Sequence, residues 1–174
     1  MKNCLFRVIA LISLTASAAF AHAAESWSYE VDEDKMTSTA TTFASLKSDN
    51  VLSLPFPYKD SENRGSLYVR QAIGKPVDVF VTIKRGQILC PGYGDGCEVT
   101  VRFDNDKPIR FRAIGPNDHS STTFFIRNTG SFLSGAKKAK RILIQFTMYN
   151  AGDQTLEFNP MKSLEWNGAS AKKK

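Results

Sequence analysis

Apolar and polar residues alternate along most of the chain from Trp27 onward. From Val77 to Ile83, for example, every odd position is β-branched and apolar. Alternation with a period of two is typical of strands that turn one face toward a core. The pattern predicts strong strands over residues 77–84, 97–104, 109–113, 142–148 and 156–158, and weaker strands over residues 27–31, 37–45, 50–54, 66–71 and 122–126.

Turn-forming residues separate these segments and indicate the fold class. Proline, glycine, asparagine and aspartate cluster between the strands, and the five residues between Phe103 and Ile109 have the length of a hairpin loop. One interruption has a helical pattern, and we expect Ser131 to cap a short helix that runs to Lys138. About nine or ten short strands at this spacing predict an all-β fold, either a β-sandwich or a partly closed barrel, with one short helix.

The first 23 residues have the features of a secretory signal peptide. Lys2 and Arg7 give a positive start, residues 8–20 form an apolar stretch, and Ala21-His22-Ala23 matches the small-x-small cleavage pattern. This stretch is shorter than the ~20 residues that a membrane-spanning helix needs, so cleavage is favoured over an uncleaved anchor. No later segment is apolar enough to span a bilayer. We therefore expect a mature protein that is periplasmic or secreted.

Residues 24–166 are predicted to form a single β domain, and residues 167–174 a disordered, lysine-rich tail. Once Lys2 and Arg7 leave with the signal peptide, 21 basic residues face 17 acidic ones, a net charge of +4. This mild and scattered excess does not predict a nucleic-acid partner. The chain has no phosphate loop and no dinucleotide fingerprint, so we expect no cofactor.

Cysteine usage agrees with export. Cys4 is removed with the signal peptide, which leaves Cys90 and Cys97 on either side of a turn-rich segment. Six intervening residues are too many for a Cys-x-x-Cys redox motif, and His119 is the only other histidine that could complete a metal site. A disulfide is therefore predicted, and no metal site. Tyr93 lies in the loop that this disulfide would close, and it is a candidate ligand contact.

Groups that could carry catalysis are few, and we expect no catalytic residue. The chain has no Gly-x-Ser-x-Gly motif, and His119, which precedes two serines, is better explained as an exposed loop residue. Asp104-Asn105-Asp106 resembles part of a calcium loop, but Lys107 and Pro108 follow it, so a hairpin turn is the better explanation. A pair of carboxylates for glycan hydrolysis, drawn from distant strands, stays open as an alternative.

Three arginines form a second candidate ligand surface. If Val99, Val101 and Phe103 face the core, Arg102 points outward, and Arg110 and Arg112 share that outer face across the hairpin. Guanidinium groups placed close together suit carboxylate or phosphate ligands. The alternative, which we favour, is a solvated face balanced by Glu98 and Asp104.

A two-cysteine segment runs into the strand Val99-Thr100-Val101-Arg102-Phe103-Asp104 and is the most specific of several landmarks along the chain. Together these landmarks resemble a group of small exported proteins of Gram-negative bacteria and their prophages. This resemblance implies export and a β-rich fold, and it supplies no active site. A looser resemblance, in general layout and in the Gly96-Cys97 start of a strand, is to the invasion-associated locus B proteins, so a virulence role is analogy alone. The other landmarks are residues 27–29, 34–36, 57–58, 67–70, 86–90 and 164–166.

These observations predict a non-enzymatic binding module of the cell envelope. Turn-rich loops on a strand scaffold, one of them closed by a disulfide, suit the capture of a protein or of an anionic envelope component. Inhibitors and immunity proteins share this physical profile. The alternatives are an enzyme that acts on cell wall or glycan through unidentified carboxylates, and a secreted factor that contacts a host.

Overall fold

The computed structural model describes residues 25–59 and 61–168, so the predicted signal peptide and residues 169–174 of the predicted tail lie outside the described residues. The described chain contains nine strands and one helix. Their bounds are β1 (Ser28–Glu33), β2 (Ala40–Val51), β3 (Arg64–Ala72), β4 (Asp78–Ile83), β5 (Cys97–Phe103), β6 (Ile109–Ile114), β7 (Thr123–Ile126), α1 (Thr129–Ala136), β8 (Ile142–Met148) and β9 (Gly152–Phe158).

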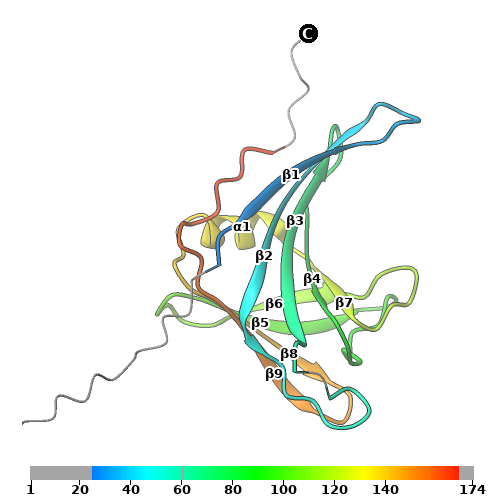
Figure 1. Cartoon of the computed structure of the whole chain (residues 1–174), viewed down its shortest axis with the longest axis vertical. Coiled ribbons are helices and arrows are strands. Elements are labelled where there is room, and N and C mark those ends of the chain that lie inside the picture. The colour runs from blue at the N-terminus through cyan, green and yellow to red at the C-terminus, as the bar shows by residue number, and fades with distance from the viewer. Residues whose placement is uncertain (1–24, 60, 169–174) are drawn as a thin grey trace, which may run out of the picture.

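All nine strands belong to one antiparallel sheet, in the order β1-β2-β3-β4-β7-β6-β5-β8-β9. The sheet curls around a single interior, and α1 lies across one of its ends (Figure 1). The backbone ladder does not join β9 back to β1, so the architecture is an open barrel. The predicted all-β class with one short helix is confirmed.

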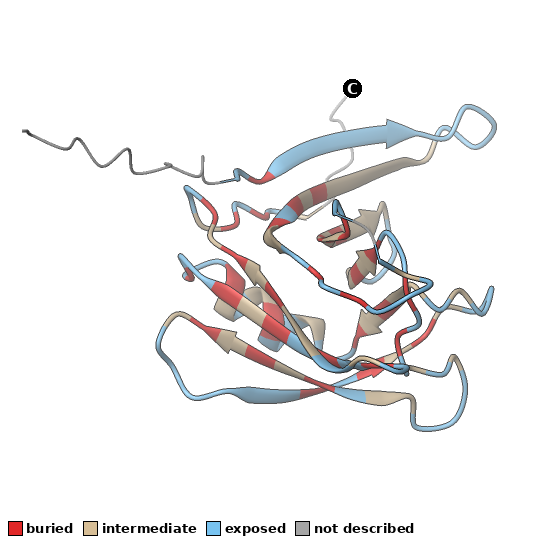
Figure 2. Cartoon of the chain, turned by 60° about the horizontal axis from the view of Figure 1, so that its bottom comes forward, coloured by how far each residue is buried: buried red, intermediate tan, exposed pale blue. Residues whose placement is uncertain are grey.

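The period-two pattern explains which side chains fill the interior. In β4, Val79, Val81 and Ile83 are buried, whereas the residues between them are only partly covered. Helix α1 contributes Phe132, which is completely buried, and its ring meets the rings of Phe103 and Phe111 edge-on at centroid distances of 5.5 and 6.1 Å. The helix therefore closes one end of the barrel with an aromatic side chain. The burial colours of Figure 2 show the alternation of covered and exposed residues along the strands.

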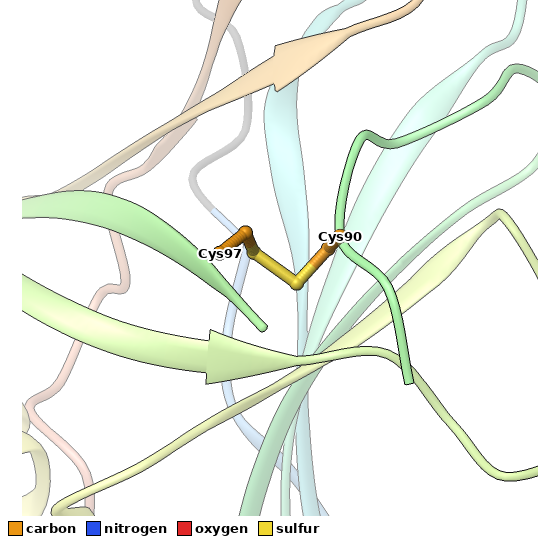
Figure 3. Close-up of a disulfide and its surroundings, with 2 residues drawn as sticks. All are labelled: Cys90 and Cys97. Atoms are coloured by element: carbon orange, nitrogen blue, oxygen red, sulfur yellow. A yellow bond between two sulfur atoms is a disulfide. The ribbon is translucent and has the colours of Figure 1, made fainter. Parts of the chain in front are cut away.

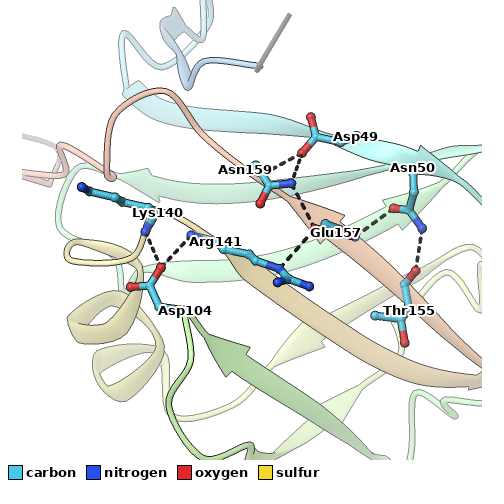
Figure 4. A network of polar contacts seen from close by, with 8 residues as sticks. All are labelled: Asp49, Asn50, Asp104, Lys140, Arg141, Thr155, Glu157 and Asn159. Atoms are coloured by element: carbon cyan, nitrogen blue, oxygen red, sulfur yellow. Dashed lines mark hydrogen bonds and ion pairs between the residues drawn. The ribbon is translucent and has the colours of Figure 1, made fainter. Parts of the chain in front are cut away.

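Side chains, and not a backbone ladder, connect β2 to β9. The register of β2 with β3 shifts between Lys47 and Val51, and this irregularity turns Asn50 toward β9. The Asn50 amide donates to the Thr155 carbonyl oxygen and accepts from the Glu157 N–H, both at 2.8 Å (Figure 4). An asparagine side chain thus takes the place of a strand residue and closes the open side of the barrel. We call this junction the seam.

A second pair of polar residues extends the seam. Asp49 accepts from the backbone N–H of Asn159 at 2.7 Å and from its side-chain amide at 3.0 Å (Figure 4). On the other side of the irregularity, the Arg64 guanidinium donates to the carbonyl oxygens of Ser48 and Asp49. The irregular backbone is therefore hydrogen-bonded although it leaves the ladder, as buried polar groups must be.

Two sequence predictions need correction. The strand predicted over residues 50–54 is absent, because β2 continues to Val51 and Leu52 then bonds through its N–H to the Asn63 carbonyl oxygen outside any strand. Helix α1 begins at Thr129, and its N-cap is Asn128 in the left-handed conformation, not Ser131. Asparagine tolerates a positive φ, which lets the chain turn from β7 directly into the helix.

The hairpin predicted between Phe103 and Ile109 is confirmed, and so is its explanation as a turn. Asp104 has a positive φ of 48°, and its carboxylate accepts from the N–H groups of Lys140 and Arg141 at 2.8 and 2.9 Å. This carboxylate fastens the β5–β6 turn to the start of β8.

Asp34 holds the turn between β1 and β2. Its Oδ1 accepts from the N–H groups of Met36 and Thr37 at 2.7 and 3.0 Å. The Thr37 N–H, and after it the Met36 N–H, lower the pKa of the Asp34 carboxyl below its ordinary value of 3.8, because both bonds favour the ionised form.

We expect the turn to loosen in acid. A carboxyl with a lowered pKa contributes stability that is fully present above pH 3.8 and is lost as the pH falls through the lowered pKa. The protection of the Met36 and Thr37 amides, measured by NMR as the exchange rate relative to the intrinsic rate at each pH, should fall over that pH range. An Asp34 that titrates at or above its ordinary value would contradict this expectation.

Candidate functional site

The topology gathers the β2–β3 connection and three further turn-rich loops at one end of the barrel. Because every neighbouring pair of strands is antiparallel, successive connections alternate between the two ends of the sheet. Residues 84–96, 115–122 and 149–151, which join β4 to β5, β6 to β7 and β8 to β9, therefore share the end opposite α1. We call them the disulfide-end loops.

The predicted disulfide is confirmed. Cys90 and Cys97 are bonded across a Cα–Cα distance of 4.9 Å, and Cys97 is the first residue of β5 (Figure 3). Gly96, just before it, has a φ of 68° and lies so close to the Ala113 carbonyl oxygen that a side chain would not fit. The bond anchors the loop to the β5–β6 hairpin at the point where glycine lets the two backbones meet.

Removal of this bond should lower the free energy of unfolding by about 2–3 kcal/mol, since the cross-link restricts the unfolded chain. The measurement is urea unfolding of the oxidised protein against the double variant C90A/C97A. Dithiothreitol is the control, because it should lower the free energy of unfolding of the parent protein and leave that of the double variant unchanged. An identical midpoint for both proteins would show that the cross-link contributes no stability.

Backbone hydrogen bonds lock the loops to one another. The Gly115 N–H donates to the Pro91 carbonyl oxygen at 3.0 Å, and the Ile88 N–H donates to the Ser121 carbonyl oxygen at 2.7 Å. The third loop joins through Tyr149, whose N–H donates to the Gln87 carbonyl oxygen at 2.9 Å. These bonds fix the loops relative to the sheet before any ligand arrives.

A hollow of about 370 Å³ lies between the disulfide loop and the loop after β6. Tyr93 stands at its rim with 74% of its surface exposed, and His119, Ser120 and Ser121 line the other side. The structure thus brings together Tyr93 and the His119 segment, which are two unrelated candidates in the sequence. No spacing in the sequence indicated this meeting, because it depends on β6 and β7 lying between β4 and β5 in the sheet.

The histidine and the serines do not form a nucleophile–base pair. Ser120 Oγ shares a hydrogen bond of 3.0 Å with Thr122 Oγ1, and Ser121 Oγ donates to the Gly86 carbonyl oxygen at 3.4 Å. His119 has a φ of 58° and is exposed, and within the described chain neither serine hydroxyl is bonded to it. The two serine hydroxyls stabilise the loop through these hydrogen bonds, and the His119 imidazole faces solvent beside the hollow.

The three predicted arginines lie on one outer face, as the alternation implies, but away from this hollow. Arg102 donates to two backbone oxygens of the hairpin loop that follows it, at 3.0 and 3.4 Å. Arg110 lies 3.5 Å from a Glu98 oxygen, and Arg112 lies opposite Glu98 in the β5–β6 register. Asp104 does not balance this face, because its carboxylate is bound to the start of β8.

Two acids line another hollow, which bears on the alternative of a glycan-acting enzyme. Glu98 and Asp153 both border a space of about 440 Å³ on the outside of β5 and β8. Asp153 Oδ1 accepts from the Thr147 hydroxyl at 2.7 Å, and Glu98 is half exposed and faces Arg110. Both carboxylates thus already have a polar partner, and the arrangement gives no specific support to a glycan-acting enzyme.

A row of aromatic rings on the outside of the sheet escaped the sequence analysis. Tyr68 stacks on Phe80 at a centroid distance of 4.9 Å, and Phe80 meets Phe125 at 5.1 Å, so the row crosses β3, β4 and β7. The Arg70 guanidinium lies 5.2 Å from the Phe80 ring centroid and 2.6 Å from an Asp78 oxygen. The alternation contained a signal for this row, because large rings occupy positions where a polar side chain is normal.

Other classes of site have little support in the described residues. Residues 25–59 and 61–168 contain no group of three or more histidine, cysteine, aspartate or glutamate side chains that could hold a metal ion. No helix in this part of the chain is long and apolar enough to cross a membrane. Compared with protein-family models, curated proteins and solved structures, the chain gives no match. The resemblance to small exported proteins stays a prediction.

Proposed function

We propose that this protein is an exported, non-enzymatic binding module that captures another protein on its disulfide-end loops. One observation carries the proposal: the disulfide loop is locked to the loop after β6, and the two enclose a hollow with an exposed tyrosine at its rim. An inhibitor or an immunity-type protein would use such a surface. The periplasm or the exterior of the cell is where we expect it to act.

Preorganisation supports the proposal. Binding costs free energy when loops and side chains must be ordered, and a loop that is already fixed avoids much of that cost. Here a disulfide and three interloop backbone hydrogen bonds fix the loops in advance. Their glycines, serines, asparagines and tyrosines also match the composition of antibody loops, in which tyrosine gives rigid contact area and the small residues adapt.

The size and surroundings of the hollow favour a protein over a small molecule. At about 370 Å³ it lies near the lower limit of ligand pockets, and it suits one side chain of a partner. Exposed Leu89 and Tyr149 belong to the same end of the barrel and extend the contact surface beyond it. A protein partner can cover hollow and surroundings together.

A photocrosslinking residue at position 93 tests the proposal. With p-benzoylphenylalanine in place of Tyr93, protein purified and returned to periplasmic extract should give a discrete crosslinked protein band. The matched control places the same residue at Ile109, which is 44% exposed and begins β6 at the other end. Equal labelling from both positions, or none from position 93, would contradict protein capture by these loops.

The captured protein then allows a quantitative measurement. Tyr93→Ala should weaken binding about tenfold or more, as the loss of a central aromatic contact does in other interfaces. Tyr93→Phe keeps the ring and should retain most of the affinity.

A further inference from the structure

Among the described strands and the helix, β1 is the one element whose residues are all exposed. It lies at the end of the strand order, and each of its six residues is accessible to solvent (Figure 2). Together with the start of β2 it forms a hairpin that projects beyond the body of the barrel (Figure 1). The seam joins β2 to β9, so β1 stays outside the closure. A strand edge in this position can pair with another chain.

The hydrogen bonds of the hairpin show which backbone groups face the open edge. The Asp34 N–H donates to the Thr39 carbonyl oxygen, so Asp34 forms a hydrogen-bonded pair across the hairpin. Antiparallel pairs alternate between bonded and non-bonded, which directs the N–H and C=O groups of Val31 and Glu33 away from β2. The same alternation, continued toward the N-terminus, directs the backbone groups of Glu25 away from β2. The Glu25 carbonyl oxygen accepts from the Met161 N–H at 3.1 Å.

The described part of the chain therefore covers this edge only at its beginning. Met161 bonds beside Glu25, and the Tyr29 hydroxyl accepts from the Glu165 N–H at 2.9 Å. Beyond that point, within the described residues, no backbone hydrogen bond reaches Val31 or Glu33 from the edge side. Val31 is 62% exposed, so its apolar side chain is accessible to a partner that pairs with this edge.

The side chains beside this edge are acidic on both faces. Glu30 and Asp32 lie on the outer face of β1, and Glu33 lies on the other. Within the described residues no ion pair engages any of the three. A second copy of β1 is a poor fit, because antiparallel pairing centred on Val31 would place Glu30 directly opposite Asp32 in both chains.

We propose that β1 accepts an extended segment of a partner protein as an additional strand, with lysine or arginine at alternate positions. The open N–H and C=O groups supply the main-chain bonds, and Glu30 and Asp32 select the basic side chains. This surface lies apart from the disulfide-end loops, and its test does not depend on Tyr93. It gives the protein a second point of attachment at the other end of the sheet.

The test uses capped peptides and isothermal titration calorimetry on the full chain. A peptide of alternating lysine and valine should bind saturably, and its glutamate–valine counterpart should not bind. Val31→Pro removes the N–H that faces the edge and leaves the bonds to β2 in place, so binding should fall about tenfold or more while the fold persists. Val31→Thr is the matched control, because it keeps the N–H and should retain the binding.

Charge reversal gives a second arm. The variant E30K/D32K should bind the glutamate–valine peptide and reject the lysine–valine peptide. Equal binding by Val31→Pro, or by a peptide whose edge-facing amides are methylated, would overturn the proposal in favour of unspecific charge attraction. Binding that arises only after Lys172, Lys173 and Lys174 are replaced by glutamine would overturn it in favour of the chain's own lysine segment as occupant.

Discussion

Replacement of Phe132 by alanine should lower the free energy of unfolding by about 3–5 kcal/mol. The ring is completely buried and lies edge-on to Phe103 and Phe111, one on each strand of the β5–β6 hairpin. Its loss removes apolar contact and leaves a cavity between the helix and the sheet. Helix α1 has eight residues, too few to hold a helical conformation without such an anchor.

Urea unfolding followed by tryptophan fluorescence measures the loss, with Ser134→Ala as the control. Ser134 is an exposed residue of the same helix, and its replacement should change the free energy of unfolding by no more than about 0.5 kcal/mol. If Phe132→Ala costs less than about 1 kcal/mol, the ring is not the anchor of α1.

Asn50→Ala is expected to cost about 2–4 kcal/mol, because it deletes both hydrogen bonds of the seam at once. The Glu157 N–H and the Thr155 carbonyl oxygen then lose their partners at a position that is partly buried. Asn50→Asp should cost less, since a carboxylate still accepts from the Glu157 N–H but cannot donate to Thr155.

Hydrogen exchange locates the effect of this substitution. The Glu157 amide should lose protection in Asn50→Ala, while amides of β5 and β6 should keep theirs at low denaturant. Asn105→Ala, in the exposed hairpin loop between β5 and β6, is the matched control and should leave both sets unchanged. Loss of protection spread evenly over the sheet would show that the seam does not open as a separate unit.

The strands and the disulfide could be predicted from the sequence because their causes are local. The alternation that runs through Val79 and Val81 reappears as one buried face of β4, and Cys90 and Cys97 needed only a turn between them. The strand predicted over residues 50–54 was wrong because apolar Leu52 and Leu54 are buried without pairing in the ladder. Apolar residues at alternate positions give the same sequence pattern whether they pair in a strand or are buried in an unpaired segment.

The candidate site could not be predicted as a unit, because long-range topology assembles it. The position of Tyr93 in the disulfide loop makes it a candidate from the sequence, but its proximity to the His119 segment depends on the strand order. The arginines at positions 102, 110 and 112 share a face as the alternation predicts, but the partners of Arg102 and Arg110 depend on the fold of the hairpin. Alternation predicts on which face of the sheet a side chain lies. It does not predict which residues from distant strands lie beside that side chain.

Because of the position of the seam, strand β1 is not needed to close the barrel. The side chains that join β2 to β9 already enclose the hydrophobic interior without any contribution from β1. Substitutions, insertions or length changes in residues 28–39 can thus accumulate without exposing the interior. The hairpin is the part of this scaffold on which new recognition sequences could be installed at least risk to folding.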